Sequence, residues 1–319
     1  MKETAKLRSK EAAAWLWERD DFLILTHRRP DGDTLGSAAG LCQALWELGK
    51  DAYVLENPET TARYQAMIAP YIAPSDFLPQ VVLTVDTADA EILQKNAGPY
   101  LDRIDLAIDH HGSHRNYAAH LCLNADRASC GEVVYDILRA LGSEISAEVA
   151  TPLYVALSTD TGCFVYANTT ANTLETAGAL IRAGADYRRV NKQLFRTKSR
   201  ARIALDGVMF SSLRYYGGDE IAVLILTLAT MEQCGVTEDD LDDVATIPNM
   251  VEGVRIGIVV RELPTGGSKV SVRTAPTADA NAICQAFGGG GHPMAAGCVV
   301  DASPEETAAK LVAVAEAAL

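Results

Sequence analysis

The segment 27–33, His-Arg-Arg-Pro-Asp-Gly-Asp, places one imidazole and two carboxylates on a short stretch of chain. An apolar run over 22–26 precedes it and is typical of a buried strand in a parallel sheet. The small residues that follow predict a tightly packed helix over 34–48, ending at Gly49. Ligands bind beyond the carboxyl ends of strands in open α/β sheets, and hard divalent cations prefer carboxylate oxygens with an imidazole. The loop therefore predicts a metal site with the candidate ligands His27, Asp31 and Asp33.

Three more apolar runs end in ionisable residues further along the chain. They are 81–85 before Asp86, 106–108 before Asp109, His110 and His111, and 153–159 before Asp160. A lone aspartate at the end of a strand is usually a cap or a turn residue. Four such clusters at strand ends would be a costly way merely to make turns, because buried ionisable groups cost free energy. We therefore expect the four clusters to form one functional site.

These residues resemble the successive motifs of the DHH phosphoesterase superfamily. The pattern HxxPDxD over 27–33, Asp86, DHH over 109–111 and DTG over 160–162 occur in the expected order. Near the C-terminus, FGGGGHPMAAG over 287–297 resembles the glycine-rich signature of the DHH-associated domain. The compact chain is most similar to the branch of nanoRNases (oligoribonucleases) that also dephosphorylate 3′-phosphoadenosine 5′-phosphate. Departures from the family pattern are Cys130, where a hydroxyl residue is frequent, and Cys163.

The resemblance implies two divalent cations as cofactors. His-plus-carboxylate sites suit Mn²⁺, with Mg²⁺ or Co²⁺ as substitutes. Two cations roughly 3.5 to 4 Å apart can clamp a phosphate and stabilise a leaving oxygen, so no serine or cysteine nucleophile is needed. The implied partition gives one cation His27, Asp31 and Asp86, and the other Asp33, Asp86, His110 and Asp160, with Asp86 bridging.

His111 and Asp109 are the candidate catalytic residues beside these ligands. Neighbouring side chains at a strand end point in different directions, so His111 is expected to contact the scissile phosphate rather than a metal, as the resemblance also suggests. Two roles are open for Asp109: it orients a histidine from behind the ligands, or it is a hydrogen-bond acceptor that ends a strand. His114 and His120 have no motif support and are interpreted as ordinary histidines.

A second set of residues is expected to bind substrate phosphate. Consecutive glycines leave the backbone free to approach a phosphate, with a helix N-terminus as one way of presenting the amide groups. Alternation along a strand places Ser271 and Arg273 on one face, and a guanidinium can hold a phosphate through two hydrogen bonds. The other reading of Arg273 is a surface ion pair of little energetic value. The predicted set is Ser271, Arg273, Gly289, Gly290, Gly291 and His292.

Composition limits the class of protein. The 319 residues, 48% of them hydrophobic, can bury a large core and suggest two domains. Seven cysteines, an odd number without CxxC spacing, favour a reduced, cytoplasmic protein. No stretch reaches the roughly 18 to 20 apolar residues of a membrane span, and the charged N-terminus lacks the apolar centre of a signal peptide. We expect no membrane association.

The net charge of −14 argues against binding of long duplex nucleic acid, while short substrates remain compatible with it. Seven basic residues and no acidic ones lie between Tyr187 and Arg202. Two readings of this basic segment stay open: a solvated helix face between domains, or a positive wall that attracts an anionic substrate.

The predicted fold class is α/β. We expect a DHH catalytic, metal-binding domain over 1–186 with a doubly wound, mainly parallel sheet. A basic helical linker over 187–202 joins it to a DHH-associated, substrate-binding domain over 203–319, a smaller α/β domain with a mixed sheet. Besides 22–26 and 34–48, the first domain is predicted to hold strands 52–56, 81–85, 106–108 and 121–123 and helices 131–141, 146–158 and 170–183. A long connecting helix is predicted over 185–216, followed by strands 221–226, 254–261 and 269–274 and helices 237–244 and 304–318.

The expected function is hydrolysis of very short oligoribonucleotides to nucleoside 5′-monophosphates, and of 3′-phosphoadenosine 5′-phosphate to AMP, by two-metal chemistry. The nearest alternative is a phosphodiesterase for cyclic or linear dinucleotides of the c-di-AMP and pApA type. A rival of another class, a catalytically silent nucleotide-binding regulator, should have lost a ligand carboxylate, and none is missing from the pattern. The assembly is compatible with a homodimer.

Overall fold

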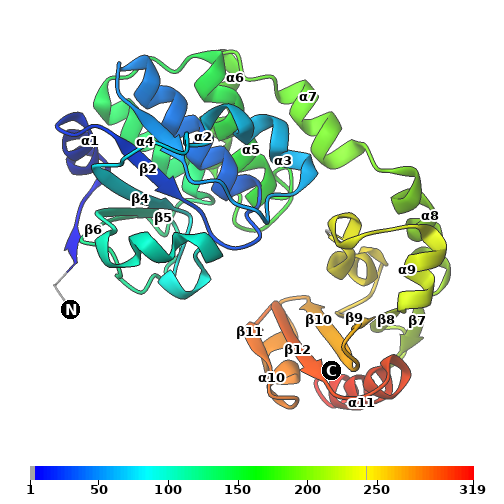
Figure 1. The fold of residues 1–319 in the computed structure, drawn as a ribbon. Helices are drawn as coiled ribbons and strands as arrows, with labels where there is room; N and C mark the ends of the chain where they lie inside the picture. Colours follow the sequence, from blue (N-terminus) through cyan, green and yellow to red (C-terminus); the bar gives the residue numbers. More distant parts are fainter. Residues whose placement is uncertain (1–3, 242) are drawn as a thin grey trace. The chain divides into compact units, whose positions relative to one another are not determined.

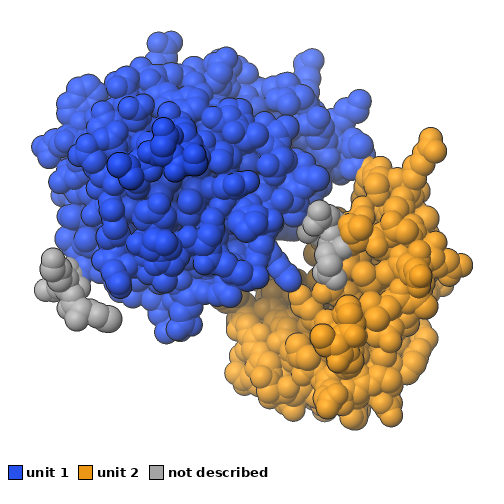
Figure 2. All heavy atoms as spheres, in the orientation of Figure 1, with its two compact units in different colours: residues 1–197 blue, residues 198–319 orange. Residues whose placement is uncertain are grey.

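The structure is a computed structural model that describes residues 4–241 and 243–319. The chain divides into two compact units, residues 1–197 and 198–319 (Figure 2). Each unit has a six-stranded sheet and a hydrophobic core of its own. Within the described ranges, no helix is long and apolar enough to cross a membrane.

The first unit is built on a fully parallel sheet in the order β1-β6-β5-β4-β2-β3 (Figure 1). Its strands are β1 (Ala5–Lys6), β2 (Phe22–Leu25), β3 (Ala52–Val54), β4 (Val81–Val85), β5 (Leu106–Asp109) and β6 (His120–Leu123). The central strands β2 and β4 are buried along their whole length, as continuous apolar runs require when both faces of a sheet are covered. The predicted parallel α/β domain is confirmed.

The helices of this unit lie on one side of the sheet, some of them against its strands and the others against those helices. They are α1 (Ser9–Trp17), α2 (Gly32–Glu47), α3 (Ala62–Ile68), α4 (Cys130–Leu141), α5 (Ala147–Asp160), α6 (Ala171–Arg182) and α7 (Tyr187–Asn191). The main core contains residues of α2, α4 and α5 together with one face of β2, β4 and β5. The opposite face packs against Leu93, Ala97 and Ile104, which lie in or beside the short 3₁₀ segments η2 (Ala90–Ile92) and η3 (Lys95–Arg103).

One cluster does not lie at a strand end. Asp160 is the last residue of helix α5, so the expectation that all four clusters follow strands is wrong for this one. The apolar run before it belongs to the predicted helix 146–158, which continues for two further residues. The structural reason is that α5 packs closely on α2, and this contact brings the end of a helix to the edge of the sheet where the strands end.

The predicted continuous helix over 185–216 is also wrong. Helix α7 is followed by one π-helical turn (Lys192–Arg196), a break, α8 (Arg200–Ser211) and strand β7 (Arg214–Tyr216). The break has a local cause, because Thr197 is extended and the Ser199 hydroxyl caps a new helix by accepting the Arg202 amide hydrogen at 2.9 Å. The division between the two units falls at this break.

The second unit contains a mixed sheet in the order β11-β12-β10-β9-β8-β7, in which only β8 and β9 are parallel. The strands are β7, β8 (Ile221–Leu226), β9 (Ile256–Glu262), β10 (Ser268–Thr274), β11 (Gly290–His292) and β12 (Ala295–Val300). Its helices are α8, α9 (Leu228–Cys234), α10 (Ala280–Gln285) and α11 (Pro304–Glu316), with 3₁₀ segments η5 (Glu238–Leu241) and η6 (Val244–Met250). The mixed sheet, the three predicted strands and the C-terminal helix are confirmed.

The predicted helix over 237–244 is wrong. Only a 3₁₀ turn forms at Glu238–Leu241, and residue 242 lies outside the described residues. Asp243 has a left-handed backbone (φ 63°), which an α-helix does not tolerate. At the start of the turn, the Asp240 carboxylate accepts hydrogen bonds from the Thr237 amide and hydroxyl, at 3.0 and 3.2 Å. Because this bonding is of the kind that begins a helix, the left-handed backbone of Asp243 is the reason that the segment does not continue.

Candidate metal centre

The loop after β2 presents the first histidine with a defined tautomer. His27 Nδ1 lies 2.7 Å from the carbonyl oxygen of Arg28, which can only accept, so Nδ1 carries the proton. His27 Nε2 is then left with its lone pair, 3.9 Å from Asp31 Oδ1 and 3.8 Å from Asp86 Oδ2. Asp31 is also the N-cap of α2, where its Oδ1 accepts the Thr34 amide hydrogen at 3.0 Å. The loop and the helix start together hold this group of side chains in place.

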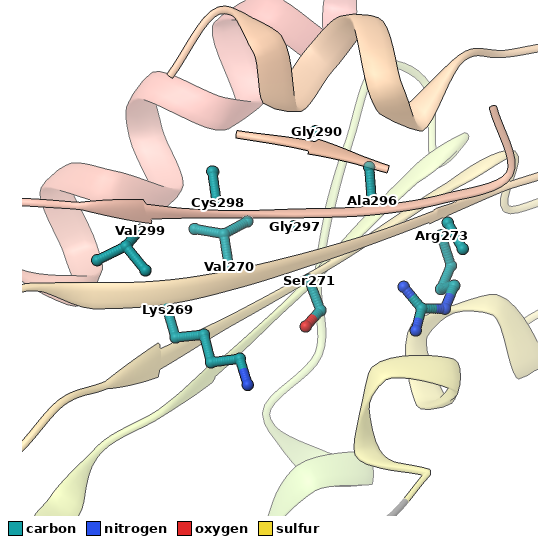
Figure 3. A pocket seen from close by; sticks show the side chains of 10 residues that line it. Lys269, Val270, Ser271, Arg273, Gly290, Ala296, Gly297, Cys298 and Val299 are labelled. Atoms are coloured by element: carbon teal, nitrogen blue, oxygen red, sulfur yellow. The ribbon is translucent and has the colours of Figure 1, made fainter. Parts of the chain in front are cut away.

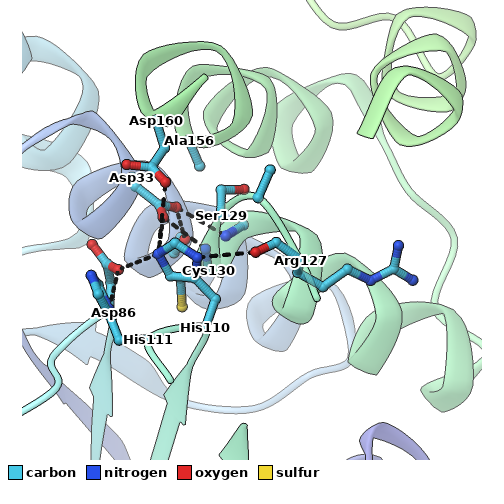
Figure 4. A network of polar contacts seen from close by, with 12 residues as sticks. Asp33, Asp86, His110, His111, Arg127, Ser129, Cys130, Ala156 and Asp160 are labelled. Atoms are coloured by element: carbon cyan, nitrogen blue, oxygen red, sulfur yellow. Dashed lines mark hydrogen bonds and ion pairs between the residues drawn. The ribbon is translucent and has the colours of Figure 1, made fainter. Parts of the chain in front are cut away.

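Asp33 is buried at the N-terminus of another helix. Its Oδ2 accepts the Cys130 amide hydrogen at 2.7 Å, and its Oδ1 accepts the Gly131 amide hydrogen at 3.0 Å (Figure 4). Both amides belong to the first turn of α4, whose free N–H groups and dipole favour a negative charge. The Ser37 hydroxyl donates a third hydrogen bond to the carboxylate at 3.0 Å. The fold therefore keeps Asp33 in one position.

Asp86 lies between His27 and His110. Its backbone is left-handed (φ 53°), which aspartate tolerates better than most residues. Asp86 Oδ2 accepts the Thr34 hydroxyl hydrogen at 2.6 Å, whereas its buried Oδ1 has no hydrogen-bond partner among the described residues. His110 Nε2 lies 3.5 Å from this Oδ1, and His111 Nδ1 lies 3.6 Å from it. A buried carboxylate oxygen in this setting is a suitable ligand for a cation.

His110 is surrounded by carboxylates. Its Nε2 is 3.7 Å from Asp33 Oδ2, 3.5 Å from Asp86 Oδ1 and 3.7 Å from Asp160 Oδ2 (Figure 4). Its Nδ1 donates to the carbonyl oxygen of Arg127 at 3.1 Å, which leaves Nε2 as the acceptor that faces these oxygens. Metal-ligating histidines have this arrangement, with the far ring nitrogen held by an acceptor.

The structure brings all six predicted metal ligands together. Two groups have ligand atoms within 4.8 Å of one another: His27, Asp31 and Asp86, as the resemblance implied for one cation, and Asp33, His110 and Asp160, which lacks the Asp86 that the resemblance also gave to the other. A third group consists of Asp86, Asp109, His110 and His111. Asp86 belongs to the first and third groups, and His110 belongs to the second and third groups. The two shared residues therefore link all three groups. The cluster can hold a divalent metal ion.

The electrostatics of the cluster also fit a cation. Burial raises the pKa of Asp33 well above its usual range, and the charges of Asp86 and Asp160 raise it further. Burial, followed by the charge of Asp31, likewise raises the pKa of Asp86. For His110, burial lowers the pKa, but the surrounding carboxylates outweigh burial and raise it overall. A divalent cation among these oxygens would remove the repulsion that raises the carboxyl pKa values.

Asp109 is fully buried and binds both histidines that follow it. Its Oδ1 accepts a hydrogen bond from His111 Nδ1 at 2.8 Å and from the His110 amide at 2.7 Å. The bond to Asp109 is the main reason that the pKa of His111 is raised. Since Nδ1 is occupied, His111 presents Nε2, and the side chain is partly exposed. This geometry agrees with the first of the two roles left open for Asp109, orientation of a histidine.

His114 lies behind Asp109 and was not singled out by its sequence. Its ring stacks on Tyr117 at 4.9 Å between centroids, and its Nδ1 accepts the Asn116 amide hydrogen at 2.9 Å. His114 Nε2 is 3.9 Å from Asp109 Oδ2, and neither buried atom has a hydrogen-bond partner in the part of the chain that the structure describes. Burial lowers the pKa of His114, so a neutral ring packs against the carboxylate.

Three of the six predicted phosphate-binding residues, Ser271, Arg273 and Gly290, line a hollow of about 430 Å³ in the second unit, and Gly289, Gly291 and His292 do not line it. Ser271 and Arg273 project from the same face of β10, as alternation predicted, and Lys269 precedes them on that face (Figure 3). Lys269 was missed, although the same alternation could have identified it.

The glycine run has a different setting from the one considered in the sequence. It follows the end of α10 and enters strand β11, so it does not lie at a helix N-terminus. A Cβ on Gly289 would come within 2.3 Å of the Gly297 carbonyl oxygen, so at this position glycine allows the backbone to approach β12 closely. His292 lies at the exposed end of β11 and is not among the residues that line the hollow.

The chain is similar in sequence and fold to known proteins. Residues 21–157 match the DHH family, N-terminal domain, and residues 220–319 match the DHHA1 domain. The chain is 32% identical to the bifunctional oligoribonuclease and PAP phosphatase NrnA of Thermus thermophilus, over 87% of this chain and 83% of that protein. It is 25% identical to the protein of the same name from Bacillus subtilis, over 88% of this chain and 90% of that protein. An exopolyphosphatase-related protein from Bacteroides fragilis shares the fold, with a TM-score of 0.87 and 22% identity over 97% of this chain and 96% of that one.

Proposed function

Since the chain belongs to the DHH family of phosphoesterases, we propose that it hydrolyses very short oligoribonucleotides to nucleoside 5′-monophosphates and 3′-phosphoadenosine 5′-phosphate to AMP, with two Mn²⁺ ions as cofactors. The observation that carries the proposal is the convergence of six histidine and aspartate side chains into groups joined by Asp86 and His110. The names of the Thermus and Bacillus relatives support the choice of substrates.

The proposed ligands of one cation are His27, Asp31 and Asp86, and those of the other are Asp33, His110 and Asp160. Asp86 is proposed to bridge the two cations, as the resemblance implied. When bound, such a pair of cations supplies positive charge for a phosphoryl group and lowers the pKa of water. The protein contributes the fixed positions of the ligands, because helix amides hold Asp33 and backbone carbonyls fix the tautomers of His27 and His110. It also contributes His111, whose Nε2 is free to contact a phosphate oxygen because Asp109 holds Nδ1.

The second unit is proposed to bind a nucleotide phosphate other than the one that is cleaved. Ser271 offers a hydroxyl and Arg273 a guanidinium on the face of the hollow, and Lys269 adds a third polar group to the row. A guanidinium fork matches a phosphate, and its charge-assisted hydrogen bonds are the strong ones in proteins. Gly289, Gly290, Gly291 and His292 lie on or beside the edge strand β11, which β12 separates from β10, and are proposed to extend this site.

The experiment is product analysis with Mn²⁺ on four substrates: a dinucleotide, a five-residue RNA, 3′-phosphoadenosine 5′-phosphate and cyclic-di-AMP. The proposal expects nucleoside 5′-monophosphates from both RNAs and AMP from 3′-phosphoadenosine 5′-phosphate. Hydrolysis of cyclic-di-AMP in preference to the other three would instead favour the dinucleotide phosphodiesterase. Binding of 3′-phosphoadenosine 5′-phosphate with no hydrolysis of any substrate would favour a silent regulator.

A further inference from the structure

A buried glutamate that belongs to neither ligand group holds the loop behind His110. Glu132 lies in the first turn of α4 and is fully buried. Its Oε2 accepts hydrogen bonds from the Ala128 amide at 2.9 Å and from the Thr173 hydroxyl of α6 at 3.0 Å. A buried carboxylate costs free energy unless its partners compensate, so these contacts call for an explanation.

The same carboxylate faces a cation on the loop. Glu132 Oε1 lies 3.5 Å from Arg127 Nη1 and, within the described residues, has no hydrogen-bond donor of its own. Arg127 is held by Asp136, one turn further along α4, through two hydrogen bonds of 2.8 and 2.9 Å. A second side chain also holds the loop, because Asn168 Nδ2 donates a hydrogen bond to the Ala128 carbonyl oxygen at 3.2 Å. Both ends of the Ala128 residue are therefore fixed by side chains.

The same loop also forms a hydrogen bond with His110. The peptide between Arg127 and Ala128 supplies both the amide that Glu132 accepts and the carbonyl that accepts the His110 Nδ1 proton at 3.1 Å. Figure 4 shows the Arg127 carbonyl aimed at the ring from the side opposite the carboxylates. One peptide unit thus joins Glu132 to His110, with its amide held on one side and its carbonyl used on the other.

We propose that Glu132 is a positioning residue for the metal centre: by fixing the Arg127–Ala128 peptide it selects the His110 tautomer that presents Nε2 to the carboxylates. The inference rests on the proposed function only where it treats His110 as a metal ligand. The selection of a tautomer by Glu132 can be observed in the protein without metal.

Glutamine at position 132 is a sharp test because it has the same shape. If the glutamine oxygen keeps the Ala128 and Thr173 donors, the amide nitrogen turns its hydrogens toward the Arg127 guanidinium. If the amide is flipped, two donors face each other at Ala128. In either orientation the glutamine NH₂ group faces a donor, the Arg127 guanidinium or the Ala128 amide, where glutamate presents an oxygen. The substitution creates no cavity.

The experiment measures the tautomer and the metal affinity of Glu132→Gln. Long-range ¹H–¹⁵N spectra of the metal-free protein at alkaline pH report which ring nitrogen is protonated, with the His110 signals identified by their loss in His110→Gln. The parent should show only the Nδ1-protonated ring, and Glu132→Gln should show a mixture with the Nε2-protonated form. Calorimetric titration should give Mn²⁺ binding about 10- to 100-fold weaker than in the parent.

Glu144→Gln is the matched control, since this exposed glutamate follows the same helix, and it should behave as the parent does. Thr173→Val removes one hydrogen-bond donor to the Glu132 carboxylate from another helix. It should change the His110 tautomer and the Mn²⁺ affinity in the same direction as Glu132→Gln, but by less. If Glu132→Gln does not fold, Thr173→Val tests the proposal in its place. A lower melting temperature with an unchanged tautomer and unchanged Mn²⁺ affinity would overturn the proposal, as would a parent that already shows mixed tautomers. A parent that cleaves no RNA, with the tautomer shift still present in the variant, would end the proposed function and support the positioning role.

Discussion

At the scale of single residues, Asp86 takes part in two of the three groups of metal-binding side chains, and one of its buried oxygens has no hydrogen-bond partner in the described residues. The other oxygen is held by Thr34, so the side chain cannot simply turn to satisfy the first. Such an oxygen is costly unless a cation completes it. The proposed metal chemistry is therefore expected to be most sensitive to substitution of Asp86.

We expect Asp86→Asn to reduce hydrolysis of a dinucleotide by more than roughly a thousandfold, or about 4 kcal/mol of activation free energy, because both cations lose a shared ligand. The measurement is the initial rate at saturating Mn²⁺, with folding checked by circular dichroism. Asp76→Asn, at an exposed aspartate in the same unit, should leave the rate unchanged. A folded Asp86→Asn protein that retains substantial activity would remove Asp86 from the bridging position.

His114 allows a prediction about pH and stability. Because burial lowers its pKa in the folded state, the unfolded chain takes up a proton first as the pH falls. The stability that neutral His114 contributes is thus present above its unfolded pKa of about 6.5 and is lost as the pH falls below that value. In His114→Phe, which keeps a ring against Tyr117 but cannot titrate, the melting temperature should fall less than in the parent between about pH 7.5 and about pH 5.5. Parallel curves for the two proteins would show that His114 does not carry this acid sensitivity.

Residue types and spacing were sufficient to select the side chains of the cluster, since each follows an apolar run that the fold brings to one edge of the sheet. Spacing could not identify the residues that hold them. Glu132 reaches its partner Thr173 on another helix, and His110 reaches Arg127 across a loop. Such pairs are set by tertiary packing, and no local pattern in the sequence marks them.

At the scale of elements, the approach of α2 to α5 determines where two of the carboxylates lie. Asp33 is in the first turn of α2, and Asp160 is the last residue of α5. Gly36 is at the point of contact, where an added Cβ would come within 2.4 Å of the Pro152 carbonyl oxygen. Since this neighbour is backbone, the two helices would have to separate.

Gly36→Ala should therefore lower the free energy of unfolding by about 1 to 3 kcal/mol, the usual cost of overpacking, and should weaken Mn²⁺ binding. Gly207→Ala in α8 is the matched control, because no described atom lies within 4 Å of the added Cβ, and it should stabilise the protein by up to about 1 kcal/mol. Urea unfolding of both variants measures the difference. Equal effects of the two substitutions would show that α2 and α5 can separate without cost.

Strand β10 makes a prediction for the second unit. Arg273→Ala should weaken binding of 3′-phosphoadenosine 5′-phosphate by about 1.5 to 3 kcal/mol, the value of a charge-assisted hydrogen bond. A chromogenic phosphodiester without a second phosphate should be affected much less. Michaelis constants for both substrates provide the measurement, and Arg139→Ala, at an exposed position on α4, is the control. Equal losses on both substrates would assign Arg273 to the chemical step or to folding.

Element prediction succeeded where hydrophobic periodicity was strong and failed where short polar interactions decided the backbone. Strands such as β4 were found because their apolar runs are continuous. The helix expected over 185–216 is interrupted because Thr197 is extended and the Ser199 hydroxyl caps a new helix. Near 237–244, the left-handed backbone of Asp243 limits the segment to a 3₁₀ turn.

At the scale of the whole molecule, the net charge of −14 coexists with the basic segment between Tyr187 and Arg202. Part of this positive charge is neutralised, because Asp206 bonds Lys198 at 2.7 Å and Arg202 at 2.8 Å. Lys192, Arg196 and Arg200 remain exposed.

The two α/β units and their parallel and mixed sheets were predictable from the alternation of elements. The strand order within each sheet was not, because it depends on long-range pairing that composition and periodicity do not encode.

The most direct test of the metal-dependent phosphoesterase is a Mn²⁺ titration of the metal-free protein in which binding and hydrolysis of a dinucleotide are followed in the same sample. We predict no hydrolysis without metal, and a rate that rises with bound Mn²⁺ and saturates at about two ions per chain, with nucleoside 5′-monophosphate as the product. Full hydrolysis in the presence of a chelator would contradict the metal centre. A folded, Mn²⁺-saturated protein that cleaves neither the dinucleotide nor 3′-phosphoadenosine 5′-phosphate would contradict the proposed function.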